Sequence, residues 1–168
     1  MTGSDSEYLI WFDAGKCIQC HGCETACKSW RGLGYGVQYR RVLNVWQGYY
    51  PLITSSSLSL SCLHCAEPAC AAACPEEAIA KNGENGLVTV DEGLCTGCGL
   101  CEEACAYGVP QITEDKVMRK CDLCREQQTV HDKPPCVDTC PGRALTIRKV
   151  SRSEKMLHED QIIKQLQK

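Results

Sequence analysis

Cysteine constrains this chain more than any other residue: sixteen of the 168 residues are cysteines, and all fall into four groups of four. The first group, CIQCHGCETAC, starts at Cys17, and the second, CLHCAEPACAAAC, starts at Cys62. The third, CTGCGLCEEAC, starts at Cys95, and the fourth joins CDLC at Cys121 to CVDTC at Cys136. Such a density is typical of chains whose interior is organised by disulfides or metal.

The spacing within the groups indicates iron–sulfur clusters. The first and third groups read C-x2-C-x2-C-x3-C, which places three thiols on one tight loop and the fourth at the start of a helix. In two-cluster ferredoxins that fourth cysteine binds the other cluster, and a proline commonly follows it. Proline follows Cys74 and Cys140 here. The sequence therefore predicts four [4Fe–4S] cubanes.

Zinc and disulfides are the alternatives to clusters. A structural zinc site uses two separated C-x2-C knuckles, and one set of cysteines fits that pattern on its own: Cys121, Cys124, Cys136 and Cys140. The groups at Cys17 and Cys95 fit it poorly, because each carries a third cysteine on the same loop. A thioredoxin-like redox pair needs a single C-x-x-C. Disulfides are disfavoured in a reducing compartment.

The compartment and the excluded partners follow from composition. The N-terminal MTGSDSEYLIWF has no signal-peptide pattern, and no stretch approaches the roughly 18 apolar residues that cross a bilayer. We therefore expect a cytoplasmic protein without direct membrane insertion, although export alongside a signal-bearing partner stays open. The net charge is −3, without the clustered basic surface of a nucleic-acid-binding protein.

An internal duplication relates the groups. LIWFDAGKCIQCHGC at 9–23 aligns without gaps on LVTVDEGLCTGCGLC at 87–101, so each segment predicts a short strand that enters a cluster loop. CPEEAIA after the second group resembles CPGRALTI at the end of the fourth. The sequence thus contains two copies of a unit, each with one tightly and one loosely spaced group.

These motifs resemble a known family. SCLHCAEPAC, CTGCGLCEEACAYGVPQI, MRKCDLC and PPCVDTCPGRAL are similar to the four-cluster ferredoxin subunits of molybdenum- and tungsten-pterin oxidoreductases. That family includes the dimethyl-sulfoxide-reductase-type iron–sulfur subunits and the small subunits of tungsten aldehyde oxidoreductases. The resemblance covers about residues 9–147. One departure is Ala106, where the family usually has proline after the cysteine, but this removes no ligand.

The resemblance implies how the cysteines are shared, because the family pairs the first group with the fourth and the second with the third. Cluster one would take Cys17, Cys20, Cys23 and Cys140; cluster two Cys121, Cys124, Cys136 and Cys27; cluster three Cys62, Cys65, Cys70 and Cys105; and cluster four Cys95, Cys98, Cys101 and Cys74. The iron of the four clusters would be the only metal. Sequence alone leaves this pairing open.

The resemblance also implies a function. We expect an α+β fold of duplicated bacterial-ferredoxin-like units with a terminal helix. The protein would be a non-catalytic electron-transfer subunit of a hetero-oligomer, relaying electrons between a large Mo- or W-pterin catalytic subunit and a second redox partner such as a flavoprotein or a quinone-linked subunit. The short chain favours an aldehyde- or formate-oxidising enzyme. An independent soluble polyferredoxin is the alternative, and structural clusters are a third.

Outside the clusters, the sequence predicts two further segments. We expect a four-cluster domain over 1–150 with a cysteine-free insert at 33–60, which contains a strand and whose aromatic residues either cover the clusters or dock a partner. Residues 151–168 predict a helical tail, either packed on the domain or acting as a partner arm. Ser151 and Glu154 form a capping-box pattern there.

The predicted helical tail has an expected apolar stripe, which uses Met156, Ile163 and Leu166, with Leu157 and Ile162 beside them.

The remaining candidates are polar side chains in or near the cysteine groups and in the tail. Cations just before the fourth group, Lys116, Arg119 and Lys120, are candidates to tune a cluster. We expect no ligand role for the four histidines, His21, His64, His131 and His158.

Overall fold

The computed structural model describes residues 6–125 and 133–167. Over these residues the protein forms short helices and strands, which confirms the predicted α+β class. The strands pair as four two-stranded antiparallel sheets: β1 (Ser6–Phe12) with β8 (Leu145–Ser151), β2 (Arg40–Gln47) with β3 (Thr54–Ser61), β4 (Ile79–Lys81) with β5 (Val88–Val90), and β6 (Gln111–Ile112) with β7 (Met118–Arg119).

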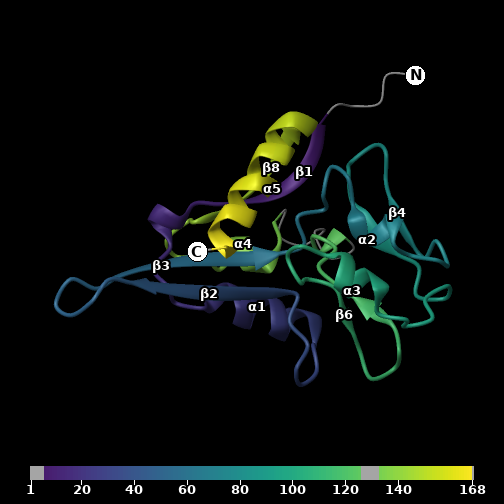
Figure 1. Ribbon diagram of the computed structural model, residues 1–168, viewed down its shortest axis with the longest axis horizontal. Helices are drawn as coiled ribbons and strands as arrows, with labels where there is room; N and C mark the ends of the chain where they lie inside the picture. Colours follow the sequence, from purple (N-terminus) through teal and green to yellow (C-terminus); the bar gives the residue numbers. More distant parts are fainter. Residues whose placement is uncertain (1–5, 126–132, 168) are drawn as a thin grey trace.

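The protein has two units, an outer one formed by the two ends of the chain and an inner one formed by its middle. Over the described residues the helices are η1 (Ala14–Lys16), α1 (Gly22–Arg31), α2 (Ala69–Ala72), α3 (Leu100–Ala104), α4 (Pro135–Asp138) and α5 (Arg152–Leu166). The outer unit joins the two ends of the chain, because β1 pairs with β8 and α1 packs on α4. The inner unit holds α2 against α3, together with the β4–β5 and β6–β7 sheets (Figure 1). Each unit therefore combines one tightly and one loosely spaced cysteine group.

The duplicated segments form the strands that the sequence predicts. Strand β1 ends at Phe12 and β5 ends at Val90, and each leads into a cysteine loop. Leu9 and Val88 are both only 1% exposed. These apolar residues anchor the start of each loop in the interior, because burying a side chain of this size contributes on the order of 2 kcal/mol.

Within the part of the chain that the structure describes, two apolar clusters form the interior, with cysteines among them. The larger lies between β1, β3, β8 and α5 and includes Leu60, Leu123, Leu145 and Ile162. The smaller belongs to the inner unit and contains Val88 and Met118 together with Cys101. Both clusters border cysteine loops, so the apolar interior and the candidate centres share the same space.

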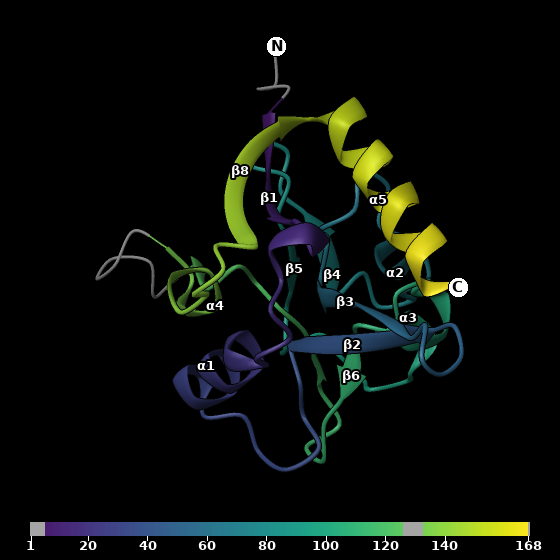
Figure 2. The ribbon, with the colours of Figure 1, turned by 90° about the vertical axis from the view of Figure 1, so that its left-hand side faces the viewer.

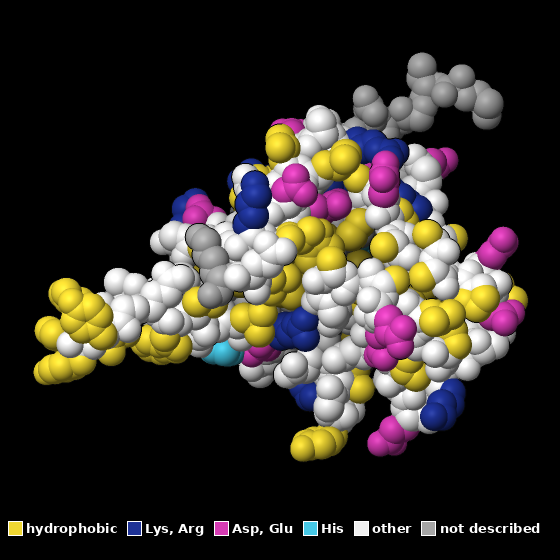
Figure 3. Space-filling model, viewed as in Figure 1, with side chains coloured by type: hydrophobic (Ala, Val, Ile, Leu, Met, Phe, Trp, Pro, Cys, Tyr) yellow, Lys and Arg dark blue, Asp and Glu magenta, His cyan; other side chains and the backbone are white. Residues whose placement is uncertain are grey.

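The insert at 33–60 forms a hairpin. The predicted strand is β2, and it pairs along its whole length with β3. Gly48 makes the turn with a positive φ of 94°, where a Cβ would collide with the Leu52 carbonyl oxygen. The hairpin projects from the body, and apolar side chains gather at its end (Figures 1 and 3). Tyr49 and Tyr50 there are 73% and 86% exposed, so these aromatic residues do not cover the centres.

The predicted terminal helix is confirmed as α5, and its start is the predicted capping box. The Glu154 backbone N–H donates to the Ser151 hydroxyl at 3.3 Å, and the Ser151 N–H donates to the Glu154 carboxylate at 2.8 Å. The helix contacts β1 and β8. It starts where β8 ends and then runs away from that strand (Figure 2). Over residues 6–125 and 133–167, no helix is both long and apolar enough to span a bilayer.

The predicted apolar stripe of that helix is wrong in part. Met156 and Leu157 are 45% and 63% exposed, whereas Lys155 and His158 are buried with Ile162. The helix turns its more polar face inward because Lys155 meets a carboxylate of β1 and His158 stacks on Trp11, with ring centroids 4.4 Å apart. Ion pairing and ring stacking therefore outweigh simple hydrophobic patterning here.

Candidate metal centres

All four cysteine groups lie on loops with left-handed backbone. Positive φ angles occur at Gln19 and His21 in the first group, His64 in the second, Gly97 and Gly99 in the third, and Leu123 and Cys124 in the fourth. Residues in this conformation turn successive backbone N–H groups toward one concave side, which suits an anion. At Gly97 the backbone also approaches Lys116 so closely that a Cβ would collide with its carbonyl oxygen. Each loop is thus shaped to cradle an anionic group.

Backbone N–H groups already point at several sulfurs. The N–H of His64 donates to Cys62 Sγ at 3.4 Å, and that of Met118 donates to Cys95 Sγ at 3.3 Å. The N–H of Ala144 donates to Cys140 Sγ, also at 3.3 Å. Such bonds stabilise a thiolate and influence the potential of a cluster bound to it. The residues present therefore fit iron–sulfur clusters.

The inner unit brings the second and third groups together. One cavity is lined by Cys74 and by Cys95, Cys98 and Cys101. Cys105 lies near the second group, because its charge, with that of Cys62, contributes to the raised pKa of Cys70. The fourth cysteine of each group is therefore beside the first three of the other.

The outer unit brings the first and fourth groups together in the same way. Cys27 in α1 is close enough to Cys136 and Cys124 for their charges to raise its pKa. The loop after Cys140 packs on the first group, where a Cβ at Gly142 would collide with the Lys16 carbonyl oxygen. The structure thus places near one another the cysteines that the resemblance groups, while the assignment of individual ligands stays a prediction.

Burial favours the protonated form of Cys27 and Cys70 when no metal is bound. It raises the pKa of Cys70 to about 11, with smaller contributions from neighbouring cysteines. Burial also raises the pKa of Cys27 to about 12, and the charge of Cys136 makes the next largest contribution. Iron binds thiolates, so binding must release these protons. All sixteen thiols are free of disulfides. Among residues 6–125 and 133–167, no three His, Cys, Asp or Glu side chains form a site for a single metal ion.

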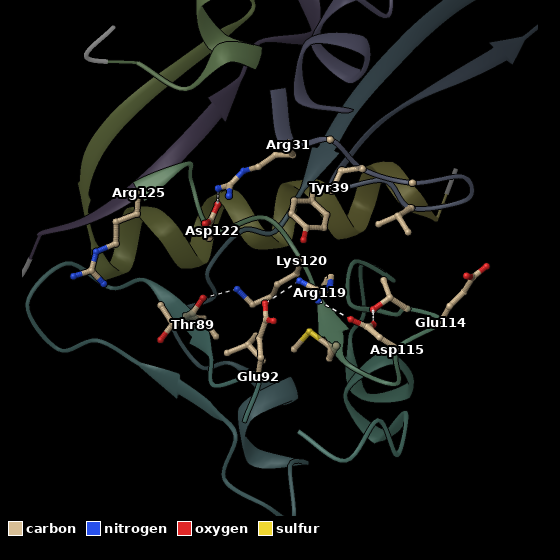
Figure 4. A pocket seen from close by; sticks show the side chains of 18 of the residues that line it. Arg31, Tyr39, Thr89, Glu92, Glu114, Asp115, Arg119, Lys120, Asp122 and Arg125 are labelled. Atoms are coloured by element: carbon tan, nitrogen blue, oxygen red, sulfur yellow. Dashed lines mark hydrogen bonds and ion pairs between the residues drawn. The ribbon is translucent and has the colours of Figure 1, made fainter. Parts of the chain in front are cut away.

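Of the three cations proposed to tune a cluster, one is buried near the cysteines. Lys120 is 5% exposed and donates to the carbonyl oxygens of Val88 and Cys121. Arg119 instead pairs with Glu92 at 2.9 Å and Asp115 at 2.7 Å at the side of a groove (Figure 4). Lys116 is exposed. The three cations are close in the sequence, but of the three only Lys120 is buried.

A second buried cation near the cysteines, Arg40, was not among the candidates from the sequence. Its side chain is held by Ser59 and Ser61 of the neighbouring strand, and the residue is 3% exposed. Burial lowers the pKa of its guanidinium, but the nearby charges of Cys136, Cys121 and Cys23 outweigh that effect and raise it. The signal was available in V-Q-Y-R-R-V-L, where alternation turns one of two adjacent arginines inward.

The histidines have structural surroundings. His64 is 1% exposed, and its Nδ1 accepts a hydrogen bond from the Val88 N–H at 2.9 Å. His21 Nδ1 lies 2.7 Å from a Glu24 carboxylate oxygen, and His158 packs in α5. His131 lies outside the described residues.

Two family models match the sequence. Residues 53–150 match the family described as "4Fe-4S dicluster domain". Residues 14–36 match the family described as "4Fe-4S binding domain". Together these matches include the loops of all four cysteine groups.

Several named proteins are similar over most of the sequence. The B component of the anaerobic dimethyl sulfoxide reductase of Escherichia coli is 38% identical over 159 residues, which cover 89% of this chain and 77% of that protein. The B component of the sulfite dehydrogenase of Allochromatium vinosum is 36% identical over 83% of this chain and 67% of that protein. The "Formate dehydrogenase iron-sulfur subunit" of Wolinella succinogenes is 35% identical over 72% of this chain and 62% of that protein.

Proposed function

The protein belongs to the family of 4Fe-4S dicluster iron–sulfur subunits that includes the B component of dimethyl sulfoxide reductase, and from that membership we propose the path that electrons take through it. It is an electron-transfer subunit of an oxidoreductase and not the catalytic one. It binds [4Fe–4S] clusters, and its sixteen cysteines suffice for four. We propose that these four clusters carry electrons between a Mo- or W-pterin catalytic subunit and a second redox partner.

The proposed ligand sets follow from the inner and outer units, each of which brings two cysteine groups together. In the inner unit, Cys74 would complete the set of the third group, and Cys105 that of the second. In the outer unit, Cys27 would complete the set of the fourth group, and Cys140 that of the first. The observation that carries this proposal is the cavity that Cys74 shares with all three loop cysteines of the third group. When bound, each cluster supplies one-electron transfer, while the protein holds the thiolates and donates N–H bonds to them.

Three further parts of the proposal concern the surroundings of the clusters. Residues 1–150 would form the cluster domain with its insert at 33–60, and 151–168 the tail. The exposed aromatic end of the β2–β3 hairpin would contact the catalytic subunit, since Tyr and Trp are enriched at interfaces. The exposed Met156 and Leu157 on α5 would face another subunit, such as a flavoprotein or a quinone-linked protein.

The substrate and compartment belong to the same proposal. The similarity to a formate dehydrogenase subunit supports a formate-oxidising partner, and an aldehyde oxidoreductase is the second choice. The cytoplasm suits a protein whose thiols must stay reduced to receive iron, whereas export with a signal-bearing partner would move the loaded complex elsewhere. Cell fractionation of the native host separates these locations.

Paired cysteine substitutions test the ligand sets. Cys74→Ala and Cys98→Ala should each lower the iron content by about four atoms, and the double variant by no more, because both residues serve one cluster. Cys74→Ala combined with Cys20→Ala should lose about eight atoms, because these residues serve different clusters. Additive loss in the first pair would refute the proposed pairing.

A further inference from the structure

Arg40 is a buried cation, and its guanidinium donates hydrogen bonds to neutral hydroxyl and carbonyl oxygens among the described residues. It opens β2 and lies opposite Ser61 in the β2–β3 register. One guanidinium nitrogen donates to Ser59 Oγ at 2.9 Å and to its carbonyl oxygen at 3.4 Å, and another donates to Ser61 Oγ at 2.7 Å. No carboxylate of residues 6–125 or 133–167 forms an ion pair with it. Hydroxyl and carbonyl groups orient the guanidinium but do not neutralise it.

A charge in this position needs a nearby anion. Moving an ion out of water is strongly unfavourable unless it is paired, and hydrogen bonds to neutral groups compensate only partly. Lys155, a buried cation elsewhere in the protein, follows that rule, since its side chain has no exposed surface and pairs with Glu7 at 2.8 Å. Arg40 therefore needs negative charge from a source other than an ion pair with a carboxylate of residues 6–125 or 133–167.

The cysteines around Arg40 identify that charge. Cys23 Sγ lies 3.5 Å from the same Ser59 hydroxyl that holds the guanidinium. Cys136, Cys121 and Cys23 lie close enough to Arg40 that negative charge on them raises the pKa of its guanidinium, against the opposing effect of burial. Cys23 belongs to the first group, and Cys121 and Cys136 belong to the fourth. Arg40 thus lies near cysteines of proposed cluster one and of proposed cluster two.

We propose that Arg40 is the shared counter-charge of clusters one and two and raises the reduction potential of both, with Ser59 linking it to Cys23. This rests on the proposed function, because it assumes that the two cysteine groups hold clusters. Arg40 is a positioning residue that acts through the surroundings of the cluster, since its guanidinium is held by serine groups and replaces no ligand.

The sign and size of the effect follow from Coulomb's law. Reduction adds one negative charge to a cluster, so a nearby cation favours the reduced form, and its removal lowers the potential. A unit charge at a separation on the order of 10 Å and an effective dielectric constant of about 20 changes an equilibrium constant by about tenfold. For one electron a tenfold change corresponds to about 59 mV. Because the site is buried, the shift should persist at high salt.

The experiment is a potentiometric titration of the full protein, followed by electron paramagnetic resonance, for wild type, Arg40→Gln and Arg40→Lys. Arg40→Gln should lower the reduction equilibrium constants of two clusters by about tenfold each, and Arg40→Lys should restore most of the loss. Arg148→Gln, which removes an exposed arginine of β8, is the matched control and should leave every potential unchanged. Unchanged potentials in Arg40→Gln with full iron would overturn the inference.

Iron content separates this inference from the proposed function. If Arg40→Gln loses about eight irons and Arg40→Lys keeps them, charge is required at this position and the inference is supported. If both variants lose the same iron, the shape of arginine rather than its charge is needed, and the inference fails. Wild type without iron would refute the proposed function itself.

Discussion

Glu7 is the centre of a buried ion network that joins the ends of the chain to the inner unit. One carboxylate oxygen lies 2.6 Å from Lys81 Nζ of β4, and the other lies 2.8 Å from Lys155 Nζ of α5. Lys81 also donates to the Ala66 carbonyl oxygen at 2.9 Å. Burial opposes the ionised form of Glu7, but the two lysines outweigh it and hold its pKa below the usual value.

Replacing Glu7 with Gln should destabilise the protein by about 3 kcal/mol, because removing one partner of a buried pair typically costs about 3–5 kcal/mol. The lower end applies, since the Glu7 side chain is 14% exposed and Lys81 keeps its bond to Ala66. The amide oxygen of Gln accepts from one lysine only, and Lys155 has no exposed surface through which water could replace the lost charge. For a protein of this size the expected fall in Tm is about 6–12 °C.

The assay is anaerobic thermal unfolding of the cluster-loaded protein at one scan rate, followed by circular dichroism and by visible cluster absorbance. Glu67→Gln is the matched control, because Glu67 pairs with Arg152 at the surface, where such pairs contribute about 0–1 kcal/mol. A fall in Tm for Glu7→Gln no larger than that for Glu67→Gln would refute the view that this network holds the two units together.

Two other predictions concern α5 and the hairpin. His158→Phe should keep the stacking on Trp11 and raise stability, since burial lowers the pKa of His158 and its ring nitrogens have no hydrogen-bond partner among the described residues. Below pH 6.5 the His158 ring binds a proton more readily in the unfolded chain than in the folded protein, so wild type loses stability as pH falls. The difference in Tm between His158→Phe and wild type should therefore widen at low pH. An equal difference in Tm at about pH 7.5 and about pH 6 would contradict this. Tyr49→Ser with Tyr50→Ser should change stability by no more than about 0.5 kcal/mol because both rings are exposed, while weakening retention of the catalytic subunit on gel filtration; undiminished retention would argue against docking through this hairpin.

The features that sequence analysis predicted correctly are those set by local chemistry. Cysteine spacing indicates the four loops because most ligands of each centre lie within a few residues of one another. The Ser151–Glu154 capping box is equally local and forms as expected. The two strands that enter cysteine loops follow from the duplication, since the same pattern repeats in 9–23 and 87–101.

The features that it missed depend on contacts between distant segments. Lys155 is buried because β1 brings Glu7 to it, 148 residues away in sequence, so helical periodicity alone favoured Met156 and Leu157 instead. Arg40 is held inside by hydroxyl groups of a strand that the sequence did not predict as its partner. The burial of Lys155 cannot be read from the local pattern of hydrophobic and polar residues, whereas for Arg40 the strand alternation in V-Q-Y-R-R-V-L indicates that one of two adjacent arginines turns inward but not what holds it there.

Iron and acid-labile sulfide per chain, measured on the complex purified without oxygen from its native host, test the central claim most directly. Four cubanes on sixteen cysteines predict about sixteen irons and about sixteen sulfides beyond those of any partner, together with molybdenum or tungsten in a copurifying large subunit. Zinc in place of iron, or iron for fewer than four clusters, would contradict the four-cluster assignment.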